Sequence, residues 1–430
     1  MKSRLIQIYN SFANSLVRYS RLYGYRSWIV FLFAFAIVVA MSASSFGTSL
    51  EPKLKSETPP ATSKTEQPLV ETRGVWLTNI DSDVLFSADK TSEAMAKLAE
   101  LHFNTVYPTV WNWGYTLYPS LVAKATTGIE LDPEPGLQNR DVLQEIIQEG
   151  HQQGMAVIPW FEFGFMAPAD SQLALLHPEW LTTRANGDAI WWEGKTHQRV
   201  WLNPLNPEVQ TFIGDLLVEL VTNYEVDGIQ LDDHFGYPSE LGYDPYTVEL
   251  YRAEHQGQNP PEEFKDPDWV RWRADKITEY VESLFVRIKS ANPDAIVSVS
   301  PNPQNFSLNS FLLDWQTWER KGLIEELIVQ LYRSSQSSFT SELSQPELIA
   351  AKQHIPVSIG ILSGLKGRPV LSGFLKQQVQ LVRERDFAGV SFFFYESLWN
   401  MARETPASRQ ESLRNLFEQP AVRKSHFAKN

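Results

Sequence analysis

Two adjacent aspartates stand at the end of an apolar stretch in residues 226–238, whose sequence is VDGIQLDDHFGYP. Asp232 and Asp233 end that stretch, and His234 comes next. If the stretch is a strand, one carboxylate can face a binding site while the other orients it. The alternative is that the pair starts a turn or caps the following helix. We interpret both aspartates as catalytic and His234 as a binding residue that they orient.

Two glutamates lie among apolar neighbours at the ends of other apolar stretches. Glu162 occurs in AVIPWFEFGF and Glu396 in GVSFFFYESLWN. Apolar surroundings raise the pKa of a carboxyl group and keep it protonated at neutral pH, as a general acid requires. The alternative for each is a structural carboxylate that pairs with an arginine or caps a helix. Glu162 is the preferred acid, and Glu396 is its rival.

Carboxyl groups in different environments are what cleavage of a glycosidic bond requires. One carboxylate stabilises or traps the sugar cation of the transition state, and one carboxylic acid protonates the leaving oxygen. Aromatic planes suit a sugar, because the C–H faces of sugar rings pack on them. The candidate substrate-binding residues are Asn79, Trp111, Trp113, His234, Tyr237, Asn302, Gln330, Tyr332 and Tyr395. The alternative for the aromatic members is that they pack loops onto the fold.

Eight short apolar runs alternate with segments of helical period from residue 72 onward. The expected strands are Thr72–Asn79, Asn104–Val110, Met155–Phe161, Asp227–Leu231, Ala295–Ser300, Glu326–Leu331, Pro356–Ile361 and Gly389–Tyr395. The expected helices are Thr91–His102, Arg140–Gln153, Pro207–Tyr224, Trp269–Ala291, Gln345–His354, Phe374–Arg385 and Pro406–Phe417. This alternation predicts an α/β fold with a parallel sheet.

The number of units favours a (β/α)8 TIM barrel over an open doubly wound sheet. No glycine-rich turn follows the first expected strand, so the nucleotide fingerprint of the open fold is missing. In a parallel barrel the carboxyl ends of all strands meet at one mouth. The candidate residues all lie at or just after such ends, so we expect them to share a site.

Composition excludes several classes of function. The formal net charge of −13 disfavours nucleic acid and anionic surfaces and suits a neutral or cationic partner. The chain has no cysteine, which removes disulfides, thiolate metal sites and cysteine nucleophiles. There is no His-x-x-x-His motif, so we expect no resident metal and no other cofactor.

The N-terminus is expected to direct export. Five basic residues and no acidic ones precede an apolar run over Trp28–Met41, and small residues follow it. We interpret residues 1–47 as a signal peptide or an uncleaved signal anchor and residues 48–70 as a polar, disordered linker. The barrel is expected over residues 71–420. The protein would then be periplasmic or extracellular, with membrane contact only through its N-terminal segment.

Several motifs in order resemble the glycosyl-hydrolase-like 10 family of bacterial proteins. They are TRGVWLTN, NTVYPTVWNWGYTLYPS, IPWFEFGF and DGIQLDDHFGYP, followed by VSVSPNP, LIVQLYR and GVSFFFYESLW. The resemblance implies a (β/α)8 barrel with glycosidase-type chemistry, in some members on cell-wall glycan. It places the acidic motif of the family's fourth strand on Asp232 and Asp233. This chain departs from the Asn-Pro-Tyr-Arg-like stretch of the cell-wall enzymes, because it has Glu162-Phe163-Gly164-Phe165 there.

The leading hypothesis is therefore an exported glycoside hydrolase acting on a polysaccharide such as the glycan strands of peptidoglycan. The second is a non-catalytic carbohydrate-binding barrel. A peptide or ester hydrolase is disfavoured, because no Gly-x-Ser-x-Gly, cysteine or zincin motif occurs. If the chain is an enzyme, two of the four carboxyl groups should face each other. A separation of about 5–5.5 Å would indicate a retaining mechanism and one of roughly 6.5–9.5 Å an inverting one.

Overall fold

The computed structural model describes residues 68–424. Its core is one sheet in which every neighbouring pair of strands is parallel, in the order β5-β2-β1-β16-β13-β12-β11-β10-β6. These strands are β1 (Thr72–Leu77), β2 (Thr105–Pro108), β5 (Ala156–Val157), β6 (Trp160–Phe161), β10 (Gly228–Asp232), β11 (Ile296–Ser300), β12 (Glu326–Gln330), β13 (Val357–Leu362) and β16 (Gly389–Phe393). Each of the eight expected strands contributes to this sheet.

The sheet closes on itself through the third expected strand. Strands β5 and β6 stand at opposite ends of the strand order, yet only residues 158–159 separate them in the chain. Ile158 N donates to Val106 O (3.0 Å) on one side, and Gln230 N donates to Pro159 O (2.8 Å) on the other. Proline has no N–H to donate, which interrupts the ladder and splits this strand in two. The result is the eight-stranded barrel that the sequence predicts.

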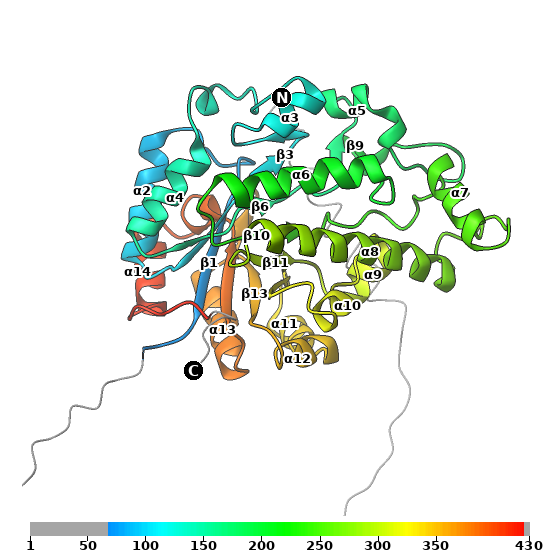
Figure 1. Cartoon of the computed structure of the whole chain (residues 1–430). Helices are drawn as coiled ribbons and strands as arrows, with labels where there is room; N and C mark the ends of the chain where they lie inside the picture. Colours follow the sequence, from blue (N-terminus) through cyan, green and yellow to red (C-terminus); the bar gives the residue numbers. More distant parts are fainter. Residues whose placement is uncertain (1–67, 425–430) are drawn as a thin grey trace, which may run out of the picture.

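Helices surround the barrel, as Figure 1 shows. Those that the sequence predicts are α2 (Ala88–Glu100), α4 (Val142–Gln152), α6 (Pro207–Asn223), α8 (Pro267–Ala291), α12 (Pro346–Ala351), α13 (Ser372–Glu384) and α14 (Pro406–Leu416). Apolar residues at helical spacing fix their inner faces. In α4, for example, Leu143, Ile146 and Ile147 are buried. The large core lies between the helices and the strands.

Shorter elements that the sequence analysis did not predict decorate the barrel. The helices are α3 (Leu121–Thr127), α5 (Gln172–Leu176), α7 (Pro245–Glu254), α9 (Gln304–Phe311), α10 (Trp315–Arg320) and α11 (Gln336–Glu342), with 3-10 turns η1 (Pro135–Leu137), η2 (Pro178–Trp180) and η3 (Tyr395–Leu398). The strands are β3 (Trp111–Asn112), β4 (Tyr115–Thr116), β7 (Met166–Pro168), β8 (Trp191–Glu193), β9 (His197–Trp201), β14 (Gly364–Leu365) and β15 (Arg368–Pro369). Elements α3, α5, β3 and β9 gather at one end of the molecule, at the top of Figure 1.

The N-terminal predictions lie almost entirely outside the described residues. At the start of the described chain Val70 forms a parallel bridge with Val422, so both ends of the domain meet there. Ordered contacts thus reach slightly beyond the expected limits of residues 71 and 420. In the range that the structure describes, no helix combines the length and the apolar character needed to cross a membrane.

Candidate active site

The two loops that carry the central carboxyl groups touch each other at the barrel mouth. Glu162 follows β6 directly, and Asp232 is the last residue of β10, the neighbouring strand. Phe165 N donates to His234 O (3.0 Å) and ties the two loops together. A Cβ on Gly164 would lie 2.3 Å from the same carbonyl oxygen, and its φ is +49°. Only glycine fits this approach.

Glu162 is buried, and all the hydrogen-bond donors to its side chain reach the same carboxyl oxygen, Oε2. Asn112 Nδ2 donates to Oε2 at 2.6 Å and Thr109 Oγ1 at 3.1 Å, with Thr78 Oγ1 at 3.5 Å. Burial and the negative charge of Asp232 raise the pKa of Glu162 to about 8, although Thr109, His234 and Asn112 act in the opposite direction. A carboxyl group with this pKa is protonated at neutral pH, as the sequence analysis expects.

Asp232 is equally buried but lies in a strongly polar setting. Its Oδ1 accepts hydrogen bonds from Ser300 Oγ and Gln330 Nε2, each at 2.9 Å. Its Oδ2 lies 3.3 Å from Nδ1 of His234. Glu162 and Asp232 therefore bring two buried carboxyl groups with different partners into one site.

Asp233 and His234 form the more exposed part of the cluster, with side chains 20% and 25% exposed. His234 Nδ1 lies 3.3 Å from Asp233 Oδ1 and 3.0 Å from the carbonyl oxygen of Glu162. Burial lowers the pKa of His234, but the two aspartates outweigh it and raise that pKa to about 10. Burial and the charge of Asp232 raise the pKa of Asp233.

The two aspartates and the histidine offer ligand atoms that all lie within 4.8 Å of one another, close enough to hold a metal ion. The ion pairs of His234 with both carboxylates already account for this spacing. We therefore assign no ion to the cluster.

Three other predicted residues join the site. Gln330 binds Asp232, and Asn302 Nδ2 donates to Asp233 Oδ2. Asn79 accepts a hydrogen bond at 3.0 Å from the same Asn112 that binds Glu162. Glu396 is held elsewhere, by Ser82 Oγ (3.5 Å) and by Asn400 Nδ2. No hydrogen bond or ion pair among the described residues joins Glu396 to the cluster, so we do not carry its acid role further.

The predicted aromatic residues divide into core and mouth. Trp111 and Tyr237 are fully buried. Trp111 stacks on Phe161 with ring centroids 5.5 Å apart, and Tyr237 packs beside Arg273, so these two rings belong to the core. Trp113, Tyr332 and Tyr395 are partly exposed.

Trp160 and the neighbouring rings of Trp76 and Phe393, which are not among the candidate binding residues, lie beside Tyr332 inside the barrel. Trp160 lies with its ring centroid 6.2 Å from Trp76 and 6.1 Å from Phe393. Tyr332 stacks on Phe393 at 5.6 Å. Trp160 Nε1 is buried and has no hydrogen-bond partner among the described residues. Trp160 and Trp76 are buried, so the partly exposed Phe393 and Tyr332 are the rings of this group on which a sugar ring can pack.

Two polar residues that hold Glu162, Thr109 and Asn112, were missed. Ser300, at the end of the fifth expected strand, contacts Asp232 directly. A signal for Asn112 exists, because it is the polar residue between Trp111 and Trp113 just after the second strand. Nothing in the local sequence indicates which neighbour it binds.

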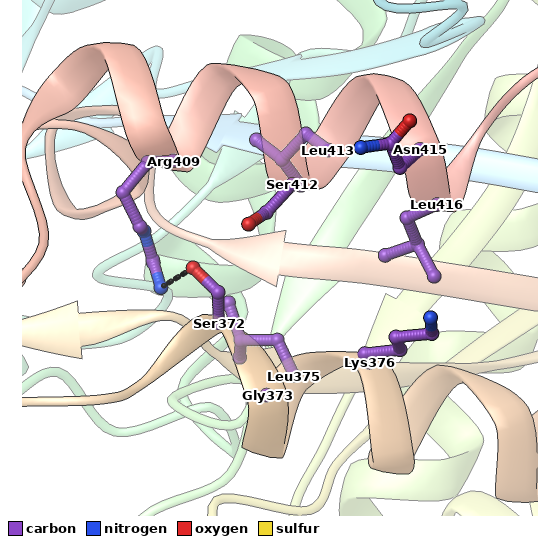
Figure 2. A pocket seen from close by; sticks show the side chains of 9 residues that line it. All are labelled: Ser372, Gly373, Leu375, Lys376, Arg409, Ser412, Leu413, Asn415 and Leu416. Atoms are coloured by element: carbon purple, nitrogen blue, oxygen red, sulfur yellow. Dashed lines mark hydrogen bonds between the residues drawn. The ribbon is translucent and has the colours of Figure 1, made fainter.

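Two cavities elsewhere in the described chain differ from this cluster in position and lining. A cavity of about 190 Å³ lies between α13 and α14, where Arg409 donates to Ser372 Oγ at 3.3 Å (Figure 2). The guanidinium group of Arg409 also binds the carbonyl oxygens of Leu398 and Val370, so it joins loops together. A polar cavity of about 360 Å³ is lined by residues of α8, α9 and α10. Neither includes Glu162 or Asp232.

The chain matches the profile of the family described as glycosyl hydrolase-like 10 over residues 71–383. It is 28% identical over 352 residues to the glycosyl hydrolase DigH of Escherichia coli K12, covering 69% of this chain and 74% of that protein. It is 24% identical over 251 residues to the glycosyl hydrolase YngK of Bacillus subtilis 168, covering 54% of this chain and 45% of that protein.

Solved glycosidase structures share the fold. The catalytic domain of a β-amylase from Paenibacillus polymyxa aligns with a TM-score of 0.55 at 11% identity, covering 81% of this chain and 99% of that domain. The PgaB (BpsB) glycoside hydrolase domain of Bordetella bronchiseptica aligns with a TM-score of 0.53 at 12% identity, covering 83% and 100%. At these identities the alignments establish the barrel alone.

Proposed function

Because the chain belongs to the glycosyl hydrolase-like 10 family, we propose that it hydrolyses glycosidic bonds in a polysaccharide, with Glu162 as general acid. Asp232 is the carboxylate that stabilises or attacks the sugar cation, and Asp233 with His234 orients it. The alternative assignment exchanges the roles of Asp232 and Asp233.

The observation that carries the proposal is the contrast between the two buried carboxyl groups. Burial raises the pKa of Glu162 to about 8, whereas Asp232 accepts two hydrogen bonds and faces His234. A glycosidase needs this division, with one group protonated before the bond breaks and the other ionised. The partly exposed rings of Phe393 and Tyr332 supply planes for the sugar.

The substrate that we propose is a polysaccharide, and the glycan strands of peptidoglycan are the first to test. The net charge of −13 and the carboxyl groups of the mouth favour an uncharged or cationic chain, so the panel sets glycans without carboxylates beside these strands, whose muramic acid units carry one. Aromatic planes with carboxylate and amide acceptors suit sugar rings and their hydroxyl groups.

The test is incubation of the purified protein with a panel of glycans, including peptidoglycan strands stripped of peptides, followed by mass analysis of the products. Glu162→Gln and Asp232→Asn should each lower turnover by at least ~10²-fold, the usual contribution of such groups. Asp233→Asn should lower it as well, to a different extent. Glu411→Gln, on the exposed face of α14, is the matched control and should cleave normally.

The products also distinguish the remaining alternatives. Proton NMR of the newly formed reducing end will report retention or inversion of the anomeric centre. Glycan binding without any cleavage by the unaltered protein would favour the carbohydrate-binding barrel. Unchanged turnover in both aspartate variants would remove the strand-four carboxylates from the mechanism.

We also propose that the protein acts outside the cytoplasm. The basic residues before the apolar run Trp28–Met41 support this location. A reporter enzyme that is active only after export, fused after residue 70, should be active. An inactive fusion would contradict export.

A further inference from the structure

The hydrogen bonds of Glu162 are asymmetric in a way that assigns different tasks to its two oxygens. Asn112 and Thr109 donate to Oε2 at 2.6 and 3.1 Å, and the weaker contact from Thr78 reaches Oε2 as well. No hydrogen bond among the described residues reaches Oε1. In a carboxylic acid, the oxygen that carries the proton acts as donor, and the other oxygen accepts.

Asn112 is fixed relative to Glu162 by contacts of the preceding tryptophan. Trp111 Nε1 donates to Gly164 O at 3.0 Å, and Phe163 N donates to Trp111 O at 3.2 Å. The β3–β4 hairpin is thereby joined to the chain on the C-terminal side of Glu162. Such a rigid frame is what a precisely placed catalytic group requires.

The side chain of Asn112 uses only its donor group in hydrogen bonds. It is fully buried, and its Nδ2 donates to both Glu162 and Asn79. Its Oδ1 is also buried and has no partner in the described part of the chain. Burying an unpaired acceptor costs about 1–3 kcal/mol, so this arrangement does not serve stability best.

We propose that Asn112 is the positioning residue of the acid: together with Thr109 it holds Glu162 Oε2 as an acceptor and leaves the proton on Oε1. This inference rests on the acid role proposed above for Glu162. In the step itself, the Oε1–H bond breaks and its proton passes to the glycosidic oxygen. The bond from the sugar carbon to that oxygen breaks, its electron pair stays on the oxygen, and the electron-deficient carbon that remains is stabilised or attacked by the carboxylate of Asp232.

The two donors bind more strongly after proton transfer than before it. Glu162 becomes a carboxylate in this step, and hydrogen bonds to an ionised acceptor are roughly twice as strong as neutral ones. An interaction that strengthens towards the transition state raises kcat and leaves KM nearly unchanged. The loss of Asn112 should therefore appear in kcat.

The test is Asn112→Ala in the full chain, with two readouts. Carbon NMR of carboxyl-labelled glutamate, with the Glu162 signal assigned from its absence in Glu162→Gln, should show the Glu162 pKa rising by about one unit, because a donor to the charged form is lost. With a cleaved glycan, kcat should fall about tenfold while KM stays nearly constant.

The matched control is Asn203→Ala. Asn203 is also buried, and its Nδ2 donates to Asp244 at 3.0 Å and to Thr247 at 2.9 Å. The substitution therefore removes a similar amide from a structural site. It should lower the melting temperature without moving the Glu162 titration. Thr109→Val, which keeps the side-chain shape, should shift the Glu162 pKa in the same direction as Asn112→Ala and keeps the test open if that variant does not fold.

An unchanged Glu162 pKa in both Asn112→Ala and Thr109→Val overturns the inference, and so does a lowered one. A lowered pKa would mean that the Asn112 amide is reversed and accepts the proton of Oε2. The titration needs no substrate. Absence of glycan cleavage by the unaltered protein would therefore count against the proposed function, separately from the positioning result.

Discussion

Glu162 and Asp232 show how neighbouring residues divide one chemistry between two similar side chains. Glu162 is buried and lies next to the negative charge of Asp232, so its proton is retained although Asn112 and Thr109 donate to one of its oxygens. Asp232 has donors on one oxygen and an imidazole beside the other. After burial, its charge is the main cause that raises the pKa of Glu162.

The first prediction concerns the pH dependence of cleavage. The pKa of Glu162 is raised to about 8, and the active form is the protonated one. Activity should therefore persist through neutral pH and be lost as the pH rises through about 8, with kcat/KM falling about tenfold per pH unit above it. The measurement is a pH profile of kcat/KM on any cleaved glycan. A loss of activity as the pH rises through the ordinary pKa of 4.5 for this carboxyl group would contradict the assignment.

At the scale of single residues, the sequence predicts which carboxyl groups belong to the site better than it predicts their hydrogen-bond partners. The apolar neighbours of Glu162 in the chain indicate its raised pKa, and the strand end indicates Asp232. Asn112, Thr109 and Ser300 come from other strands, and their contacts depend on how the barrel closes. No local pattern carries that information.

At the scale of elements, long periodic segments were predictable and short ones were not. The eight barrel strands and seven surrounding helices follow from apolar runs and helical period. The hairpin β3–β4 has two residues in each strand, too few to show an alternation. The split between β5 and β6 follows from Pro159, which the sequence shows but whose effect depends on the neighbouring strands.

The second prediction separates core aromatic residues from exposed ones in these short elements. Trp111 in β3 is fully buried against Phe161, so Trp111→Ala should lower the free energy of unfolding by about 3–5 kcal/mol. Trp192 in β8 is 51% exposed, so Trp192→Ala should change it by no more than about 0.5 kcal/mol. Urea unfolding followed by tryptophan fluorescence measures both. Equal losses would show that Trp111 is not the core anchor of the hairpin.

At the scale of the whole molecule, a column of polar side chains runs through the inside of the barrel. Trp76 Nε1 donates to Gln230 Oε1 (2.7 Å), and Gln230 Nε2 donates to Ser298 Oγ (3.0 Å). Ser298 Oγ donates to Glu326 Oε1 at 2.9 Å, and Arg423 pairs with the other oxygen of Glu326. The chain after α14 thus returns to the barrel, where its arginine reaches the interior.

The third prediction compares two shortened chains. A protein that begins at Lys64 should fold with the melting temperature of the full protein, because its described contacts are intact. One that begins at Arg73 loses Glu71, whose carboxylate pairs with Arg73 (2.7 Å) and Arg383 (2.6 Å), and should lose about 3–5 kcal/mol. Thermal melting by circular dichroism measures both. If the chain from Lys64 aggregates while the full chain in detergent does not, the N-terminal apolar run belongs to the folded core.

The fourth prediction concerns the closure of the barrel by its C-terminal segment. Val422 bridges to Val70, and the largely buried Arg423 forms an ion pair with Glu326 inside the barrel. Arg423→Ala leaves Glu326 buried without its cation, and breaking such a pair costs about 3–5 kcal/mol. Arg414→Ala removes a surface arginine from its pairs with Glu100 and Glu411, and it should leave the melting temperature unchanged. A normal melting temperature for Arg423→Ala would show that the segment covers the barrel without stabilising it. A loss confined to Arg423→Ala, and reversed when Glu326→Gln is added, would show that the ion pair itself holds the segment after α14 on the barrel.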